Sequence, residues 1–311
     1  MSRYFLSDSL TGLPPLAFER FLFNEERHLF TQSDHGWHIF SWVNAEVQQT
    51  EARICFHVEN GIARSPYRAP FGSVQFTGSL SADHLLQFLT ETIKRLEETG
   101  VKQIIIRDAP QLYRPKSAAL LAVLLGDLGF VSKHIEINAS IPVDNQPLEN
   151  KISHDERYHL RRAQREGLRF NKLETTEWES VYRFIYQCRA ERGMKLSMTA
   201  HQLGKTIEAC PHDFLFFEVC KGNERLAAAI AVQVNPRILY NFYYGHSYSS
   251  NALSPVVLLL NGQYDFCNNR DCRVLDMGTS MRENKINLSL LHFKRQVGGE
   301  LSMKLTFEKT Y

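Results

Sequence analysis

The sequence predicts a mixed α/β protein built from two units that an internal duplication relates. The first half has an order of strands and helices that the second half repeats, about 170 residues further along the chain. Asp108 and Asp276 end corresponding strands, and Gly129 and Gly298 end the helices that follow them. A chain of 311 residues is long enough for two ordinary domains. We therefore expect domains at 1–145 and 173–311, joined by a basic helical segment at 146–172.

In the first half, apolar residues alternate along 51–58, as in a strand with one buried face. Ser81 is placed to cap a helix that carries one apolar face and ends at Gly100. Further apolar patterns predict a strand at 101–106, a helix at 117–128 and a strand at 131–141.

The second half repeats this order with three strand-like runs, two helices and two closing strands. Ser254-Pro255 is typical of a helix start, because proline is tolerated in the first turn. The predicted strands are 214–219, 225–233, 238–244, 274–277 and 301–307, and the predicted helices are 254–268 and 287–297.

Composition excludes several classes of protein. A formal charge of +2, with 43% hydrophobic and 23% charged residues, is ordinary for a globular protein and gives no reason to expect DNA binding. The sequence has no secretory leader pattern and no long apolar run, so we expect a cytoplasmic protein without integral membrane association. The six cysteines lack paired zinc spacing and read as free thiols, and Cys210 with His212 is too small a cluster for a metal.

The most informative stretch is 275–299, in which a buried strand ends in a polar turn and a helix follows. Gly278 breaks the strand, Asn287 is placed as a helix cap, and Gly298-Gly299 ends the helix. Such a turn directs backbone N–H groups toward the carboxyl end of the strand, where open α/β sheets bind ligands. An ordinary strand-helix unit has the same pattern, so spacing alone leaves both interpretations open.

This stretch resembles the C-terminal signature of the FemAB-like acyltransferases, which are tandem GNAT-fold proteins. The resemblance rests on Asp276, Gly278, Ser280, Phe293-Lys294 and Gly298-Gly299, and on the upstream run Tyr243-Tyr244-Gly245-His246-Ser247. It covers roughly the last 75 residues by motif and the first half by architecture. It implies an N-acyltransferase in which the donor lies in a gap between two central strands, flanked by 241–245 and 274–277. The usual GNAT pyrophosphate loop is absent, and 245–251 stands in its place.

Acyl transfer to an amine needs an aligned donor carbonyl and hydrogen-bond donors for the developing oxyanion, but no covalent residue. We see no nucleophile elbow and no convincing Cys-His pair, so direct transfer is expected. Asp276, Tyr244 and His246 are the catalytic candidates, although Asp276 could instead cap the turn. Tyr243 and Tyr244 alternate across a strand, so at most one faces the cleft. The expected donor-binding residues are Gly245, Ser249, Asn251, Ser254, Gly278, Ser280 and Lys294.

Two further regions are candidates for substrate binding. The proline-rich segment 65–72 contains Tyr67, Arg68 and Phe71, and it is either a rigid acceptor loop or a plain connection. In the segment 146–172, Arg157, Arg161 and Arg165 recur at helical spacing. They suit phosphate contacts with RNA or a nucleotide, but a solvated helix has the same pattern.

The sequence thus favours an N-acyltransferase that moves an acyl or aminoacyl group to an amine on a small molecule or a peptide. We expect no tightly bound cofactor, acyl-CoA or aminoacyl-tRNA as the donor, and tRNA as a possible partner. The alternative is a non-catalytic module that binds a nucleotide or RNA on the same duplicated fold.

Overall fold

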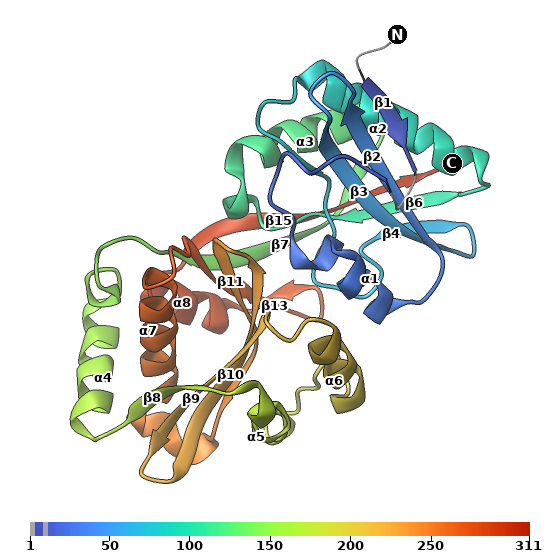
Figure 1. Ribbon diagram of the computed structural model, residues 1–311. Coiled ribbons are helices and arrows are strands. Elements are labelled where there is room, and N and C mark those ends of the chain that lie inside the picture. The colour runs from blue at the N-terminus through green and yellow to red at the C-terminus, as the bar shows by residue number, and fades with distance from the viewer. Residues whose placement is uncertain (1–3, 9–11) are drawn as a thin grey trace. The chain divides into compact units, whose positions relative to one another are not determined.

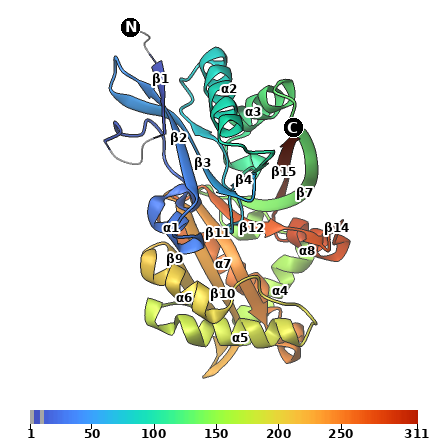
Figure 2. The ribbon, with the colours of Figure 1, turned by 90° about the vertical axis from the view of Figure 1, so that its right-hand side faces the viewer.

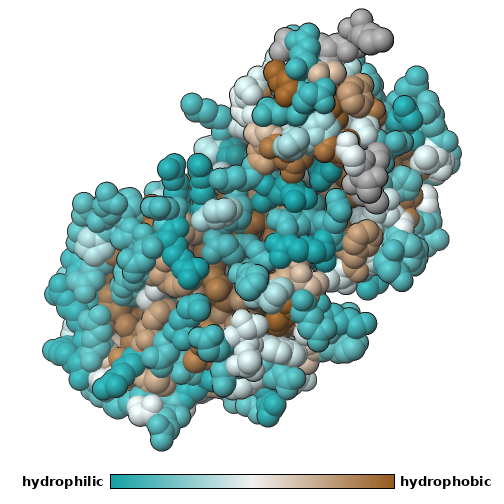
Figure 3. Space-filling model, viewed as in Figure 1, coloured by the Kyte–Doolittle hydropathy of each residue, from teal (hydrophilic) through white to brown (hydrophobic). Residues whose placement is uncertain are grey.

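The structure is a computed structural model that describes residues 4–8 and 12–311 (Figure 1). The chain forms two compact units. Unit 1 contains residues 1–136 and 303–311, and unit 2 contains residues 137–302. On the face shown in Figure 3, hydrophilic side chains predominate, since most large apolar side chains are buried in the cores of the two units.

Unit 1 has a mixed sheet in the order β1-β2-β3-β4-β6-β15, and β5 (Gln75–Phe76) pairs with β3. β4 and β6 are parallel neighbours, whereas β15 runs antiparallel to β6 through residues 306–310. The strands are β1 (Tyr4–Ser7), β2 (Trp37–Asn44), β3 (Gln49–Glu59), β4 (Ile62–Ser65), β6 (Gln103–Arg107) and the end of β15 (Glu300–Thr310).

Two long helices, α2 (Ala82–Glu98) and α3 (Pro115–Asp127), contribute apolar faces to the core of unit 1. The Ser81 hydroxyl accepts a hydrogen bond from the His84 amide and caps α2, as the sequence predicts. The shorter helices of the unit are η1 (Leu22–Asn24), α1 (Glu26–Gln32) and η2 (Gln111–Tyr113).

Unit 2 has a sheet in the order β7-β12-β11-β10-β9-β8, in which only β11 and β12 are parallel. The strands are β7 (Val131–Pro142), β8 (Arg169–Leu173), β9 (Phe214–Lys221), β10 (Glu224–Asn235), β11 (Ile238–His246) and β12 (Val274–Thr279), and β13 (Met281–Arg282) forms a short hairpin with β14 (Lys285–Ile286).

Helices cover both faces of this sheet (Figures 1 and 2). α4 (His154–Arg165) and α7 (Pro255–Asn268) share one core cluster with the sheet, and α5 (Trp178–Ala190) packs on β10 and β11 from the other side with α6 (Ala200–Ala209) beside it. The remaining helices are α8 (Leu288–Gln296), η3 (Leu148–Asn150), η4 (Thr175–Glu177) and η5 (Tyr248–Leu253).

The compact units differ from the predicted domains in two ways. The end of β7 pairs with β12 in unit 2, and the end of β15 pairs with β6 in unit 1, so each strand changes unit along its length. A strand pattern shows that a segment is extended but not which sheet it joins, and the boundary at 145 is therefore misplaced. The segment 146–172 is part of unit 2, because Leu160 and Ala163 of α4 are buried in its core.

Candidate functional site

The site begins where two neighbouring strands of unit 2 part. β11 and β12 pair through three positions only, from Ile238 with Val274 to Tyr240 with Asp276, although β11 continues to His246. On its other edge, β12 has a register shift against β7 just after Asp276. A gap therefore opens directly after Asp276. Of the two segments predicted to flank the gap, 241–245 lies beyond the last pair of β11 with β12. In the other segment, 274–277, the first three residues are paired with β11, and Met277 is the first that is not.

Asp276 lies at the base of this gap and is almost fully buried, at 1% exposure. Its Oδ1 accepts hydrogen bonds from Asn138 Nδ2 at 2.8 Å, from Ser140 Oγ at 3.3 Å and from the Gly278 amide at 2.7 Å. Gly278 has a φ of +75°, which a residue with a side chain adopts only with strain. Both the turn-capping interpretation and the orienting interpretation of Asp276 are compatible with this geometry.

Lys294 is the least expected feature of the gap, because a lysine on a short amphipathic helix is usually exposed. It is 1% exposed, and its Nζ donates to the carbonyl oxygens of Gly278 at 2.8 Å and Thr279 at 2.9 Å. Burial lowers the pKa of the amine to about 8, Asp276 opposes this shift, and Arg189 adds to it. Lys294 thus holds the last two residues of β12 and keeps a third N–H for another acceptor.

Arg189, at the end of α5, is a residue that the sequence analysis missed. Its Nη2 donates to the Tyr244 carbonyl at 3.3 Å, in the part of β11 that lies beyond the parting. Its Nε is buried without a hydrogen-bond partner. Gly245 brings α5 this close, since a Cβ there would lie 3.1 Å from Cys188 Cβ. The helical pattern of α5 gave no sign that one of its arginines faces the end of β11.

The packing of Gly245 against α5 gives one structural reason for a glycine at this position. Its lack of a side chain serves the close approach of Cys188 and Ile185, and a role in donor binding stays a prediction.

His246 lies at the end of β11 between two side chains from different elements. Its Nε2 is 3.1 Å from Arg192 Nη2 and 2.8 Å from Asn251 Oδ1. An arginine can only donate, so Nε2 is the acceptor in the contact with Arg192. Burial lowers the pKa of His246, the charge of Arg192 lowers it further, and the Asn251 contact opposes both. A neutral imidazole at pH 7 follows, which is the form that accepts a proton.

The two tyrosines of β11 separate as the strand alternation predicts. Tyr243 anchors the loop before α6, because its hydroxyl contacts Ser197 Oγ at 2.5 Å and accepts from the Met198 amide at 3.0 Å. Tyr244 packs against the core cluster of unit 2, and burial raises its pKa. A catalytic role for Tyr244 stays a prediction.

The segment expected to replace the GNAT pyrophosphate loop forms η5. The amides of Ser247, Ser250 and Ser254 donate to carbonyl oxygens of the chain itself, and Asn251 contacts His246. Ser254 adopts a left-handed conformation, with φ and ψ of 49°, just before α7. Ser249 Oγ lies 3.2 Å from Ser247 Oγ. These amides are therefore already occupied by bonds within unit 2.

Ser280 differs from these residues, because its hydroxyl is fully buried and has no hydrogen-bond partner. Its amide donates to Ile137 and its carbonyl accepts from Asn287, so the backbone on both sides is fixed. Ser280 thus adds an unused polar group next to the Gly278 turn.

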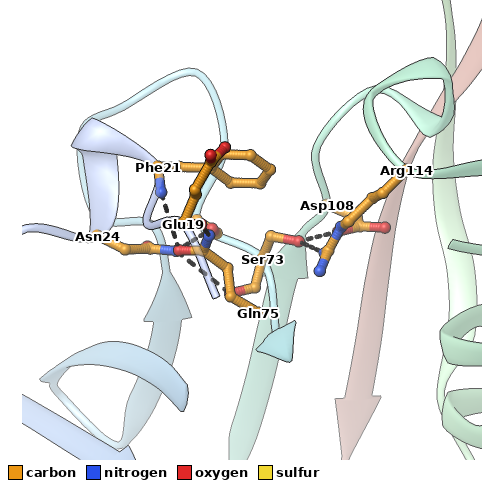
Figure 4. Close-up of polar contacts among 8 residues, drawn as sticks. Glu19, Phe21, Asn24, Ser73, Gln75, Asp108 and Arg114 are labelled. Carbon is orange, nitrogen blue, oxygen red and sulfur yellow. Dashed lines mark hydrogen bonds and ion pairs between the residues drawn. The ribbon is translucent and has the colours of Figure 1, made fainter. Parts of the chain in front are cut away.

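The corresponding strand end in unit 1 has a different structure (Figure 4). Asp108 and Arg114 form an ion pair at 3.1 Å, and Ser73 bonds to both of them. Arg114 also lies 5.6 Å from the ring centres of Phe21 and Phe76. Next to this group, Gln75 accepts from Asn24 Nδ2 at 2.8 Å and donates to the Glu19 carbonyl, which ties the N-terminal segment to the sheet.

Of the three residues predicted to bind the acceptor in the segment 65–72, one is buried and two are accessible. Phe71 is 1% exposed and makes edge-on contacts with Phe21 and Phe23, so it is a core residue and the prediction that it binds substrate is wrong. Tyr67 stacks on His57 at 3.8 Å, and Arg68 covers Tyr67 at 4.6 Å. Tyr67 and Arg68 remain accessible, and their role as acceptor contacts stays a prediction.

The three arginines of the basic helix α4 also differ from one another. Arg157 donates to the carbonyl oxygens of Glu149 and Ile152, so it fixes the start of the helix. Arg161 forms an exposed ion pair with Glu149 at 3.3 Å. Arg165 is exposed and lines a shallow surface groove together with Arg161 and Tyr158. Phosphate binding by Arg161 and Arg165 stays a prediction.

Within residues 4–8 and 12–311, no cluster of three metal-ligating side chains occurs. In the same part of the chain, no helix is long and apolar enough to cross a membrane.

Comparison with known proteins gives no match by sequence: neither a family model nor a curated protein corresponds to this chain. Solved structures match well. FemX superposes with a TM-score of 0.71 and 13% identity over 93% of this chain and 92% of FemX. L-PGS from Bacillus licheniformis superposes with a TM-score of 0.58 and 12% identity, over 96% of this chain and 93% of L-PGS. The C-terminal domain of a putative lysylphosphatidylglycerol synthetase from Agrobacterium fabrum superposes with a TM-score of 0.56 and 12% identity, over 84% of this chain and 82% of that domain.

The chain has the FemAB-like fold. Identities of 12–13% establish the fold alone, and this fold agrees with the predicted mixed α/β chain of two units. An ancestral duplication within this sequence stays a prediction. In the FemAB-like fold, the resemblance places the donor between two parted central strands, and in this chain β11 and β12 of unit 2 part in that manner.

Proposed function

We propose that this protein is an N-acyltransferase that moves an acyl or aminoacyl group directly from a donor to an amine. The observation that carries the proposal is the parting of β11 and β12 at Asp276, together with the buried Lys294 of α8, which donates to the carbonyls at the end of β12. Burying a charged group costs stability, and proteins keep such groups mainly where function needs them. A buried cation and a buried carboxylate at one strand parting are therefore typical of a reaction site.

In the proposed reaction, the neutral amine nitrogen attacks the donor carbonyl and forms the new C–N bond. The bond from the carbonyl carbon to the donor's oxygen or sulfur then breaks, the proton of the amine passes to a base, and the departing oxygen or sulfur takes up a proton in return. The carbonyl oxygen carries negative charge in the transition state. The third N–H of Lys294 suits it, since a fixed donor acts best in a site that excludes water.

In this proposal, His246 is the base and Asp276 orients the groups around Lys294. His246 is neutral at pH 7, because burial and Arg192 lower its pKa, so it can accept the proton. Asp276 already accepts three hydrogen bonds, and we assign it to orienting the Gly278 turn and balancing the charge of Lys294.

Of the two candidate donors, the structure of η5 favours an aminoacyl ester on tRNA over acyl-CoA. A pyrophosphate loop needs free backbone N–H groups, and those of Ser247, Ser250 and Ser254 are used within the chain. The acceptor is an amine on a small molecule or a peptide. With tRNA as the donor, the enzyme works in the cytoplasm.

The test is a single-turnover assay with radiolabelled aminoacyl-tRNA and acyl-CoA in the presence of a panel of amines, together with thermal-shift titration of each donor. A donor that binds the folded protein must raise its Tm. Transfer from aminoacyl-tRNA supports the proposal. Binding of tRNA without transfer to any amine would instead favour the non-catalytic RNA-binding module, to which the exposed arginines of α4 would then belong.

A further inference from the structure

Two cysteines of unit 2 meet where α7 ends and the chain turns toward β12. Cys267 lies in the last turn of α7, and Cys272 lies two residues before Val274, the first residue of β12. The Cys272 amide donates a hydrogen bond to the Cys267 carbonyl at 3.1 Å. Asp271, between them, has a left-handed conformation with a φ of +53°. This is the geometry of a Schellman turn, which commonly brings its first and last side chains into contact.

The two side chains make the contact that this turn favours. The thiols of Cys267 and Cys272 are hydrogen-bonded to each other, and both belong to the buried core of unit 2. The Gln233 amide nitrogen lies 3.9 Å from Cys272 Sγ and donates to it. The bond from Cys267 lowers the pKa of the Cys272 thiol, burial opposes this, and Gln233 supports it. The same bond and burial both raise the pKa of the Cys267 thiol. Cys272 is therefore the better nucleophile of the pair.

We propose that Cys267 and Cys272 are a redox-active pair of thiols, which hydrogen peroxide oxidises to an intramolecular disulfide. Cys272 keeps 4% of its surface exposed and Cys267 keeps none, so a small oxidant reaches Cys272 first. The Cys272 thiolate attacks a peroxide oxygen, the O–O bond breaks, and the sulfur becomes a sulfenic acid.

The second step closes the disulfide. The Cys267 sulfur attacks the sulfenic sulfur of Cys272, the S–S bond forms, and the S–O bond breaks. Two electrons pass from the thiols to the peroxide. The two thiol protons end in the two molecules of water that leave, so atoms and charge balance.

The disulfide ties the end of α7 to the start of β12. Val274 pairs with Ile238 of β11 on one side and with Pro142 of β7 on the other, so the sheet already fixes the chain just beyond the bond. Neither thiol is among the residues assigned to acyl transfer. The inference therefore goes beyond the proposed function and stands or falls separately from it.

The test treats the reduced full-length protein with hydrogen peroxide under native conditions. Catalase removes the peroxide, N-ethylmaleimide in denaturant blocks the remaining thiols, and trypsin digests the protein without a reductant. Trypsin cleaves after Arg270, between the two cysteines, so the disulfide appears in the mass spectrum as two linked peptides. We expect this linked pair to increase with peroxide and to disappear with dithiothreitol.

Three variants make the test specific. Cys272→Ser loses the linked pair. In Cys267→Ser, the second thiol is absent, so Cys272 stays a sulfenic acid and dimedone labels it, which does not happen in the wild-type protein. Cys188→Ser is the matched control, because Cys188 on α5 is also 4% exposed, and this variant forms the linked pair as the wild type does. Circular dichroism confirms folding, and the wild-type result decides the matter where a serine variant folds poorly.

The partly exposed Cys220 shows that the oxidant has acted. If Cys220 is oxidised while Cys267 and Cys272 both remain free thiols, these two cysteines only pack together and the inference is wrong. The inference is equally wrong if Cys272 reaches the sulfinic acid without any linked pair, because Cys267 then fails to resolve the sulfenic acid.

Discussion

Asp108 and Asp276 lie at the ends of corresponding strands in the two units. Strand pairing and charged neighbours differ between the two carboxylates, and these differences indicate which of them belongs to a reaction site. In unit 1, β4 pairs with β6 up to Ser65 and Ile106, where β4 itself ends, so the two strands do not part along their length. In unit 2, pairing stops at Asp276. Asp108 forms an ion pair with Arg114, whereas Asp276 accepts hydrogen bonds from Asn138, Ser140 and the Gly278 amide, and its charge raises the pKa of the nearby Lys294 amine.

An unpartnered nitrogen alone does not separate the two sites. Arg114 also has a buried Nε without a hydrogen-bond partner, but Asp108 and Ser73 bind its other end. The difference lies in the strands and in the partner of the carboxylate. Asp108 is closed off by its ion pair with Arg114, whereas Asp276 lies where two strands part and beside a buried amine, an arrangement more typical of a functional site.

The largest expected effect is the loss of turnover in Lys294→Met, which keeps an unbranched side chain and removes the charge. We expect the single-turnover rate to fall about 100- to 1000-fold, as for the loss of one oxyanion donor. Donor affinity should fall by about 1.5 to 3 kcal/mol, as for a lost hydrogen bond to a charged group. Circular dichroism confirms folding. A folded variant with normal rate and normal donor affinity would remove Lys294 from the site.

Next in size is the loss of stability in Arg114→Met, which leaves Asp108 buried without its cation. Removing one partner of a buried ion pair costs about 3 to 5 kcal/mol of the free energy of unfolding. Urea unfolding measures this loss. The comparison predicts an unchanged transfer rate under conditions in which the variant stays folded, and a specific loss of rate would show that unit 1 takes part in the chemistry.

The pH dependence of transfer is a smaller effect that reports on the same amine. Burial lowers the pKa of Lys294 to about 8, so its charged form is lost as pH rises through 8, and the rate should fall above that value. Arg189 contributes to the lowering, and Arg189→Gln should therefore move the fall to higher pH. Rate profiles from pH 6 to about 10 measure both. A fall at the same pH in both proteins would mean that another group titrates.

The contribution of Lys294 to stability changes with pH in the direction opposite to its contribution to the rate. Because the folded protein lowers the pKa of Lys294, the unfolded chain binds more protons between pH 8 and the ordinary lysine value of 10.5. The contribution of Lys294 to stability therefore rises with pH across this window. Lys294→Met lacks this rise.

The smallest expected effect is on tRNA binding in Arg161→Gln with Arg165→Gln. Each phosphate contact that is lost should reduce the slope of log affinity against log salt by about 0.7 to 0.9. Arg157 is left unchanged because it fixes the start of α4. Filter binding across salt concentrations measures the slope, and an equal slope in both proteins makes α4 a solvated helix.

Local patterns in the sequence predicted what depends on local physics. The Ser81 cap of α2 and the Asn287 cap of α8 are where the sequence puts them, whereas β12 continues two residues past the predicted strand end at 277, to Thr279. The strand exchange of β7 and β15 could not be predicted, because a strand's partner is set by tertiary packing. The burial of Phe71 and the position of Arg189 were missed for the same reason, since both depend on which distant element covers them.

The most direct test of the account compares Asp276→Asn with Asp108→Asn, two identical substitutions at corresponding strand ends. Single-turnover rate, donor affinity and the free energy of unfolding are measured for both. The account predicts that Asp276→Asn keeps donor affinity and loses at least about 100-fold in rate, whereas Asp108→Asn loses stability and keeps the rate of its folded fraction. A normal rate in folded Asp276→Asn, with a specific loss of rate in Asp108→Asn, would contradict the assignment of the reaction to unit 2.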